Sequence, residues 1–146
     1  MADRTQSYAN HAQIVPMYHY VTFGLLVVTF IGACVNLYES LGDESRLYSA
    51  SLLVTLTLAA LFAFFLMRVF ALKAQDRAIR AEENLRHYVL TGSLLDSRLT
   101  IRQVVGLRFA SDAELPSLAR RAADEGLSAD DIKKAVRAWR ADTHRV

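Results

Sequence analysis

YVTFGLLVVTFIGACVNL, residues 20–37, and LYSASLLVTLTLAALFAFFLM, residues 47–67, are two apolar runs that lie close together in the first half of the chain. Neither run contains Asp, Glu, Lys or Arg. Each is near the roughly 20 residues that a helix needs to cross a hydrocarbon layer about 30 Å thick. The sequence therefore predicts two transmembrane helices, 20–37 and 47–72, joined by a short external loop, 38–46.

Charges beside the runs predict the orientation of this hairpin. The residues after the second run are rich in Lys and Arg, whereas the connecting segment has Arg46 beside Glu39, Asp43 and Glu44. Short segments with excess Lys and Arg stay in the cytoplasm. We therefore expect a multi-pass protein with both termini cytoplasmic: an N-terminal segment, 1–19, and a cytoplasmic helical domain, 73–146.

Small residues predict how the membrane helices pack. Burial of apolar surface cannot drive pairing inside lipid, so helices approach closely where side chains are small. We predict that a small-residue stripe on each helix faces the other, or that one stripe contacts a second copy. The stripes are Gly24, Gly32 and Asn36 on the first helix, and Ser51, Thr55, Ala59 and Ala63 on the second. We expect Asn36 to make a hydrogen bond that pairs the helices.

The second apolar helix is expected to continue into the cytoplasm as far as Gly92, because no helix breaker precedes that residue. Along the continuation, residues recur at alternating intervals of 3 and 4: Ala71, Ala74, Ala78, Ala81, Leu85 and Tyr88. This spacing is typical of a packed helix seam. We expect the seam to contact another helix, from this chain or from a second copy. Asp76 and Arg80, and likewise Glu82 and Arg86, are predicted to form ion pairs on the solvated face of this helix.

Two short helices are expected after the long one. The first runs over 101–110 behind a Thr100 N-cap, whose hydroxyl can accept a hydrogen bond from a free backbone N–H. The second begins with a capping box of Ser111 and Glu114 and ends at Gly126, because glycine readily adopts the left-handed C-cap conformation.

A third short helix is expected over 129–142 behind a Ser128 N-cap. Its apolar face would consist of Ile132, Ala135, Val136 and Trp139. No segment alternates apolar and polar residues as a strand does. The predicted fold is all-α: an integral membrane helical hairpin whose second helix extends into a small helical cytoplasmic domain.

Basic side chains predict contacts with anionic lipid headgroups. Each Lys or Arg near an anionic leaflet contributes about 1 kcal/mol to binding. Arg68 and Lys73 follow the second run, and four more basic residues are expected on one side of the last helix: Lys133, Lys134, Arg137 and Arg140. For the last helix a solvated face is the favoured interpretation, because neighbouring acids cancel much of the field.

Residues 119–136, ARRAADEGLSADDIKKAV, have the spacing of a helix-turn-helix motif around Gly126. They favour, as an alternative function, a membrane-tethered regulator that binds nucleic acid. Asp130 and Asp131 at the start of the second helix argue against it, because a recognition helix presents that end to base edges among phosphates. We do not expect nucleic acid as a partner.

No catalytic or metal-binding pattern occurs in the sequence. The one cysteine, Cys34, lies within the first apolar run, and no two histidines have ligand spacing on one helix. Serines and carboxylates occupy cap and turn positions that already account for them. We therefore expect no catalytic residue, cofactor or metal, and keep a cofactor-carrying or enzymatic membrane subunit as a second alternative.

Four further segments are recognisable: NHAQIVPMYHY (10–20), FALKAQDRAIRAEENLRHYVLTG (70–92), LTIRQVVGLRFASDAELPSLARRA (99–122) and IKKAVRAWRADTHRV (132–146). Together they resemble a family of small bacterial membrane proteins known only as a domain of unknown function. The resemblance implies a bacterial inner membrane and a two-helix plan, and no activity. We expect a non-enzymatic accessory, scaffold or self-associating interaction module, whose partners are the bilayer and a protein or second copy.

Overall fold

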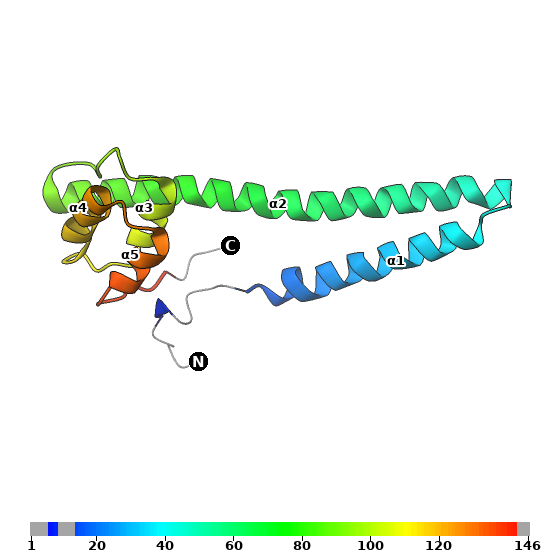
Figure 1. Cartoon of the computed structure of the whole chain (residues 1–146), viewed down its shortest axis with the longest axis horizontal. Helices are drawn as coiled ribbons and strands as arrows, with labels where there is room; N and C mark the ends of the chain where they lie inside the picture. The colour runs from blue at the N-terminus through cyan, green and yellow to red at the C-terminus, as the bar shows by residue number, and fades with distance from the viewer. Residues whose placement is uncertain (1–5, 9–13, 143–146) are drawn as a thin grey trace. The chain divides into compact units, whose positions relative to one another are not determined.

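The computed structural model describes residues 6–8 and 14–142. Its named elements are all helical (Figure 1): the π-helical stretch η2 (Met17–Thr22), α1 (Phe23–Glu39), α2 (Glu44–Thr91), α3 (Ile101–Leu107), α4 (Leu115–Glu125) and α5 (Ala129–Ala135). The predicted all-α class is confirmed. The chain divides into two compact units, residues 14–71 and residues 1–13 with 72–146, and α2 contributes to both.

The first unit holds most of the apolar surface. Met17–Glu39 and Glu44–Thr91 are both long and apolar enough to span a membrane. Each helix begins before the apolar run that predicted it. Pro16 can precede η2 because the first turn of a helix needs no backbone N–H partner. At the start of α2, Asp43 accepts hydrogen bonds from the Ser45 amide at 3.0 Å and hydroxyl at 2.7 Å.

The buried residues of this unit form a seam that differs from the predicted one. They are Ala33 and Ser40, and on α2 Ala50, Thr57 and Phe64. Within each helix these residues recur every seven positions. A seven-residue repeat drifts only about 20° around a helix and so stays on one face. Steps of four residues advance by about 40° each, so the predicted α2 stripe winds away from α1.

The prediction that the two small-residue stripes face each other is therefore wrong. Gly32, Thr55, Ala59 and Ala63 are exposed, and Gly24, Asn36 and Ser51 are only partly buried. A Cβ atom added at Gly24 or Gly32 would meet nothing within 4 Å. The Ser51 and Thr55 hydroxyls donate to carbonyls of their own helix, at 2.7 and 3.0 Å. Contact of these stripes with a second copy stays a prediction.

The predicted pairing bond from Asn36 is also not formed. Within residues 14–71, the Asn36 side chain makes no hydrogen bond, and the Asn36 backbone carbonyl accepts a hydrogen bond from the Ser40 hydroxyl at 2.7 Å. The polar contact between the helices comes instead from Tyr18, whose hydroxyl donates to the Phe64 carbonyl at 2.6 Å. The Tyr18 and Phe64 rings stack at 4.1 Å, and Phe23 lies 5.8 Å from Phe64. Aromatic packing thus joins η2 and α1 to α2.

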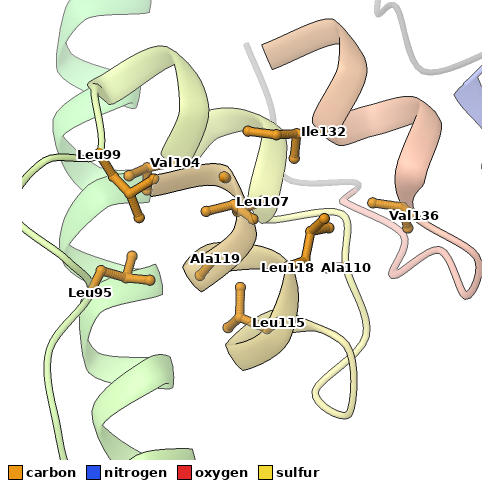
Figure 2. Close-up of a cluster of buried hydrophobic side chains, with 11 residues drawn as sticks. Leu95, Leu99, Val104, Leu107, Ala110, Leu115, Leu118, Ala119, Ile132 and Val136 are labelled. Atoms are coloured by element: carbon orange, nitrogen blue, oxygen red, sulfur yellow. The ribbon is translucent and has the colours of Figure 1, made fainter. Parts of the chain in front are cut away.

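The second unit, called here the helical domain, comprises residues 6–8 and 72–142 of the described chain. Its core lies among α3, α4, α5 and the segment 93–100 (Figure 2). The core residues are Leu95, Leu99, Val104, Leu107, Ala110, Leu115, Leu118, Ala119, Ala122, Ile132 and Val136. Helices α3 and α5 approach closely at Gly106, where an added Cβ would lie 3.0 Å from the Ala129 carbonyl oxygen.

Several predicted helix ends in this domain are confirmed. α2 ends at Thr91 before Gly92, and α4 ends before Gly126; both glycines have positive φ, 76° and 64°. Thr100 caps α3, in a capping box with Gln103. Ser128 caps α5 and accepts a hydrogen bond from the Asp131 amide. Local capping chemistry was therefore a sound guide at these four ends.

Other predicted ends are wrong. α3 stops at Leu107 and α5 at Ala135, well before the predicted residues 110 and 142. The chain after each helix is used for pairing instead: Ala110 and Trp139 form an antiparallel bridge, and the Arg140 amide donates to the Phe109 carbonyl at 2.8 Å. The predicted Ser111–Glu114 capping box is also absent, since α4 begins at Leu115 without a side-chain cap.

Candidate functional site

A buried carboxylate marks the most unusual polar site of the helical domain. Glu83 on α2 is only 4% exposed. Its Oε2 lies 2.9 Å from Nη1 of Arg86, and its Oε1 lies 3.5 Å from Nη1 of Arg140. Arg86 also pairs with Asp112 at 2.6 Å. We call Glu83, Arg86, Asp112 and Arg140 the Glu83 cluster.

The Glu83 cluster joins α2 to the paired segments that follow α3 and α5. Besides its two ion pairs, Arg86 donates from Nη2 to the Ala110 carbonyl at 2.7 Å. Arg140 comes from the segment that pairs with Phe109 and Ala110. A buried charge is tolerated only when it is paired and hydrogen-bonded. The cluster therefore depends on the short α3 and α5 helices, which leave these segments free to reach α2.

A second ion pair lies nearby. Arg108 is 9% exposed, and its Nε lies 3.1 Å from Oδ2 of Asp142. Its guanidinium carbon lies 4.6 Å from the centre of the Phe109 ring, a cation–π distance. The Asp142 amide donates to Oε1 of Gln6 at 2.8 Å, so the N-terminal segment reaches the same place.

A cavity of about 340 Å³ opens between these two ion pairs. Its polar lining consists of Gln75, Glu82, Glu83, Arg108, Arg140 and Asp142. Oε1 of Gln75 is buried and has no hydrogen-bond partner among the described residues. Carboxylates, guanidiniums and an amide can bind and orient a polar group, but both Glu83 oxygens are already engaged by arginines. The Glu83 cluster therefore serves to hold the segments of the domain together, and the polar cavity lies beside it.

The predicted seam of α2 lies on another face of the helix. Ala74, Ala78, Ala81, Leu85 and Tyr88 are all exposed, and Ala71 is partly buried. On the face of α2 toward the domain, Ile79 and Glu83 are buried and Gln75 and Arg86 are partly buried. Arg80 and Arg86 donate to the carbonyls of Leu99 and Ala110. Among the described residues, no other helix of the same chain covers this seam. Contact of the seam with a second copy stays a prediction.

Sequence reasoning missed the Glu83 cluster because it assigned those charges to the solvated face. Asp76–Arg80 and Glu82–Arg86 were expected to pair within α2. Instead, Arg86 pairs with Glu83 and Asp112, and Arg80 donates to the Leu99 carbonyl at 3.2 Å. The signal that could have revealed this face is Ile79, the large aliphatic residue four positions before Glu83 and away from the alanine seam.

The predicted basic side of the last helix is also wrong. Because α5 ends at Ala135, Arg137 and Arg140 lie beyond it. Arg140 pairs with Glu83, and Lys134 pairs with Asp130 at 3.1 Å. Lys133 remains on α5, partly buried. On α2, Arg68 is partly buried and Lys73 is exposed, so their contact with headgroups stays a prediction.

The N-terminal segment contacts the same α5 ion pair. The Tyr8 hydroxyl donates to Oδ2 of Asp130 at 2.8 Å, and Lys134 lies 5.6 Å from the centre of the Tyr8 ring. The Tyr8 hydrogen bond, with the one from Lys134, lowers the pKa of Asp130, and the same bond to Asp130 raises the pKa of Tyr8. Tyr8 of the N-terminal segment thus contacts α5 at Asp130 and Lys134.

A surface ion cluster connects the segment between α2 and α3 to α4. Arg98 donates to both oxygens of Asp96 and, at 2.8 Å, to Oδ1 of Asp124 on α4. The Arg98 side-chain hydrogen bonds hold the pKa of Asp96 at about 2, well below its ordinary value. The cluster is solvent-exposed, so it positions the segment and adds little stability.

Metal chemistry has no geometric support in the described part of the chain. No group of three or more His, Cys, Asp or Glu residues is placed to hold an ion within residues 6–8 and 14–142. Nδ1 of His87 lies 2.7 Å from the Ser93 carbonyl, and Nδ1 of His19 lies 3.0 Å from the Val15 carbonyl. His11 and His144 lie outside the described residues.

The model of DUF6526, a family of unknown function, matches residues 1–146. The chain belongs to that family. The match covers the whole chain, which agrees with the resemblance seen in the four sequence segments. Searches of curated proteins and of solved structures found no match.

Proposed function

We propose that the chain is a non-enzymatic integral protein of the bacterial inner membrane. The carrying observation is the exposure of its two apolar helices. Each helix contains an apolar 18-residue window, and only 6% of the window in Met17–Glu39 and 17% of the window in Glu44–Thr91 is buried inside the chain. A core helix of a soluble protein would be mostly buried. Such an apolar helix surface must be shielded from water by something other than the chain itself. The hydrocarbon core of a membrane fits both the length of the two helices and their lack of charged residues.

The same proposal places both termini in the cytoplasm. Gln6 and Tyr8 contact Asp142 and Asp130, so the N-terminal segment belongs to the helical domain. Segments that contact each other must lie on the same side of a bilayer, which requires an even number of crossings. The excess of Lys and Arg after the second apolar run favours the cytoplasmic side.

The helical domain then acts as an interaction module that α2 connects to the membrane. Its polar junction holds the short helices on one face of α2. The other face of α2 remains open to a partner. A scaffold or accessory role needs such a surface and no reacting group.

Alkaline extraction tests the membrane assignment. Carbonate buffer strips peripheral proteins from membranes but leaves integral ones in the pellet. We expect the full chain, produced in bacterial cells, to stay with the membranes in carbonate and to be released by a mild detergent. Release by carbonate alone would contradict the proposal.

A further inference from the structure

We propose that a second copy of the chain docks on the outer face of α2, so that two copies form a parallel two-stranded coil in which Arg77 of each copy pairs with Glu82 of the other. The outer face consists of Ala74, Ala78, Ala81, Leu85 and Tyr88. This inference rests on the proposed function, because a common membrane sets the two α2 helices parallel.

Exposure of large apolar side chains shows that the outer face lacks a cover in the helical domain. Leu85 is 64% exposed, Tyr88 53% and the adjoining Val89 75%. Ile79 and Glu83 are buried on the other side of α2, where Glu83 pairs with Arg86 and with Arg140 of the segment after α5. α2 therefore uses one face to hold its own domain. Ala78 and Glu82 also line the cavity beside the Glu83 cluster, and the rest of the apolar outer face has no covering helix among the described residues.

The spacing on the outer face fits a helix of the same kind. Its residues follow one another at intervals of 4, 3, 4 and 3. This is the core spacing of a two-stranded coil, in which each side chain inserts between four residues of the facing helix. Alanines at the first three positions bring the helices close, and Leu85 and Tyr88 supply most of the buried apolar area.

Charge complementarity identifies the occupant as a second copy in parallel orientation. Arg77 and Glu82 flank the outer face on opposite edges, both are exposed, and neither forms an ion pair with a described residue. In a parallel coil, a residue on one edge faces the residue five positions later on the opposite edge of the partner. Arg77 therefore meets Glu82 of the second copy, twice by symmetry. An antiparallel pair would set like edges against each other.

Charge reversal tests the pairing in the full chain in mild detergent, with sedimentation as the readout. We expect Arg77→Glu and Glu82→Arg each to weaken the dimer about fivefold, since attraction becomes repulsion at both symmetric pairs. The double variant Arg77→Glu/Glu82→Arg should restore the wild-type dimer. A double variant as weak as the single ones would overturn the proposal, as would a complex that holds one copy with a different protein.

Disulfide crosslinking in native membranes tests the face itself. In a Cys34→Ser background, Ala81→Cys should give a disulfide-linked dimer on mild oxidation. Ala113→Cys, at another exposed alanine that lies outside the outer face, should not. Equal crosslinking at both positions would contradict the proposal. Carbonate extraction of the same samples separates the two ideas: a crosslinked dimer released by carbonate would refute the membrane assignment and leave the coil standing.

Discussion

Replacing Phe109 with alanine should lower the free energy of unfolding of the helical domain by about 4 kcal/mol, the usual cost of removing a buried aromatic ring. Phe109 is fully buried, and its ring lies 4.8 Å from the Trp139 ring and 4.6 Å from the Arg108 guanidinium. Truncation would leave a cavity where the segment after α3 meets the segment after α5. The substitution should therefore separate the segments that carry the Glu83 cluster.

Pulse proteolysis of the full chain across a urea series in mild detergent measures this effect. Fluorescence of Trp139, the only tryptophan, reports on the same contact. The matched control is Phe109→Leu, which keeps most of the volume and should cost less than about 1.5 kcal/mol. Equal stability of the alanine and leucine variants would show that Phe109 does not pack as described.

Glu83→Gln should destabilise the helical domain by about 3 kcal/mol, the lower end of the range for breaking a buried ion pair. The amide is nearly isosteric but uncharged, so Arg86 and Arg140 lose their shared counter-charge. The lower end applies because Arg86 keeps Asp112 and the Ala110 carbonyl.

The same unfolding assay applied to Glu125→Gln provides the control. Glu125 pairs with Arg121 at 3.0 Å, but both side chains are about half exposed. Loss of that pair should cost less than about 0.5 kcal/mol. If Glu83→Gln were as mild as Glu125→Gln, burial of the Glu83 carboxylate would be refuted.

Local signals in the sequence predicted much of this fold. The capping residues Thr100 and Ser128 and the glycines 92 and 126 placed four helix ends correctly, because each acts on its own neighbours in the chain. Helix ends set by tertiary pairing were missed. The bridge between Ala110 and Trp139 takes both residues out of helices that their own sequence favours.

Faces of helices were harder to predict than helices. Ser51, Thr55, Ala59 and Ala63 suggested a packed stripe because all four are small, yet the buried residues of α2 within the first unit are Ala50, Thr57 and Phe64. A seven-residue repeat keeps these buried residues on one face of the helix, and that position decided which residues are buried. The small size of a side chain did not. Glu83 was missed for a related reason: apart from Ile79 four positions earlier, nothing local distinguishes it from Glu82, and the segments at 110–112 and 140, far along the chain, make its burial favourable.

Side-specific labelling of cysteines tests the membrane hairpin most directly. In a Cys34→Ser background, Ser45→Cys places a thiol in the first turn of α2, next to the connection from α1, and Ala113→Cys places one in the helical domain; both positions are exposed. A membrane-impermeant maleimide is added to intact spheroplasts and to permeabilised ones. A hairpin with both termini inside predicts labelling at position 45 in both samples and at position 113 only after permeabilisation. Labelling of position 113 in intact spheroplasts, or protection of position 45 there, would contradict it.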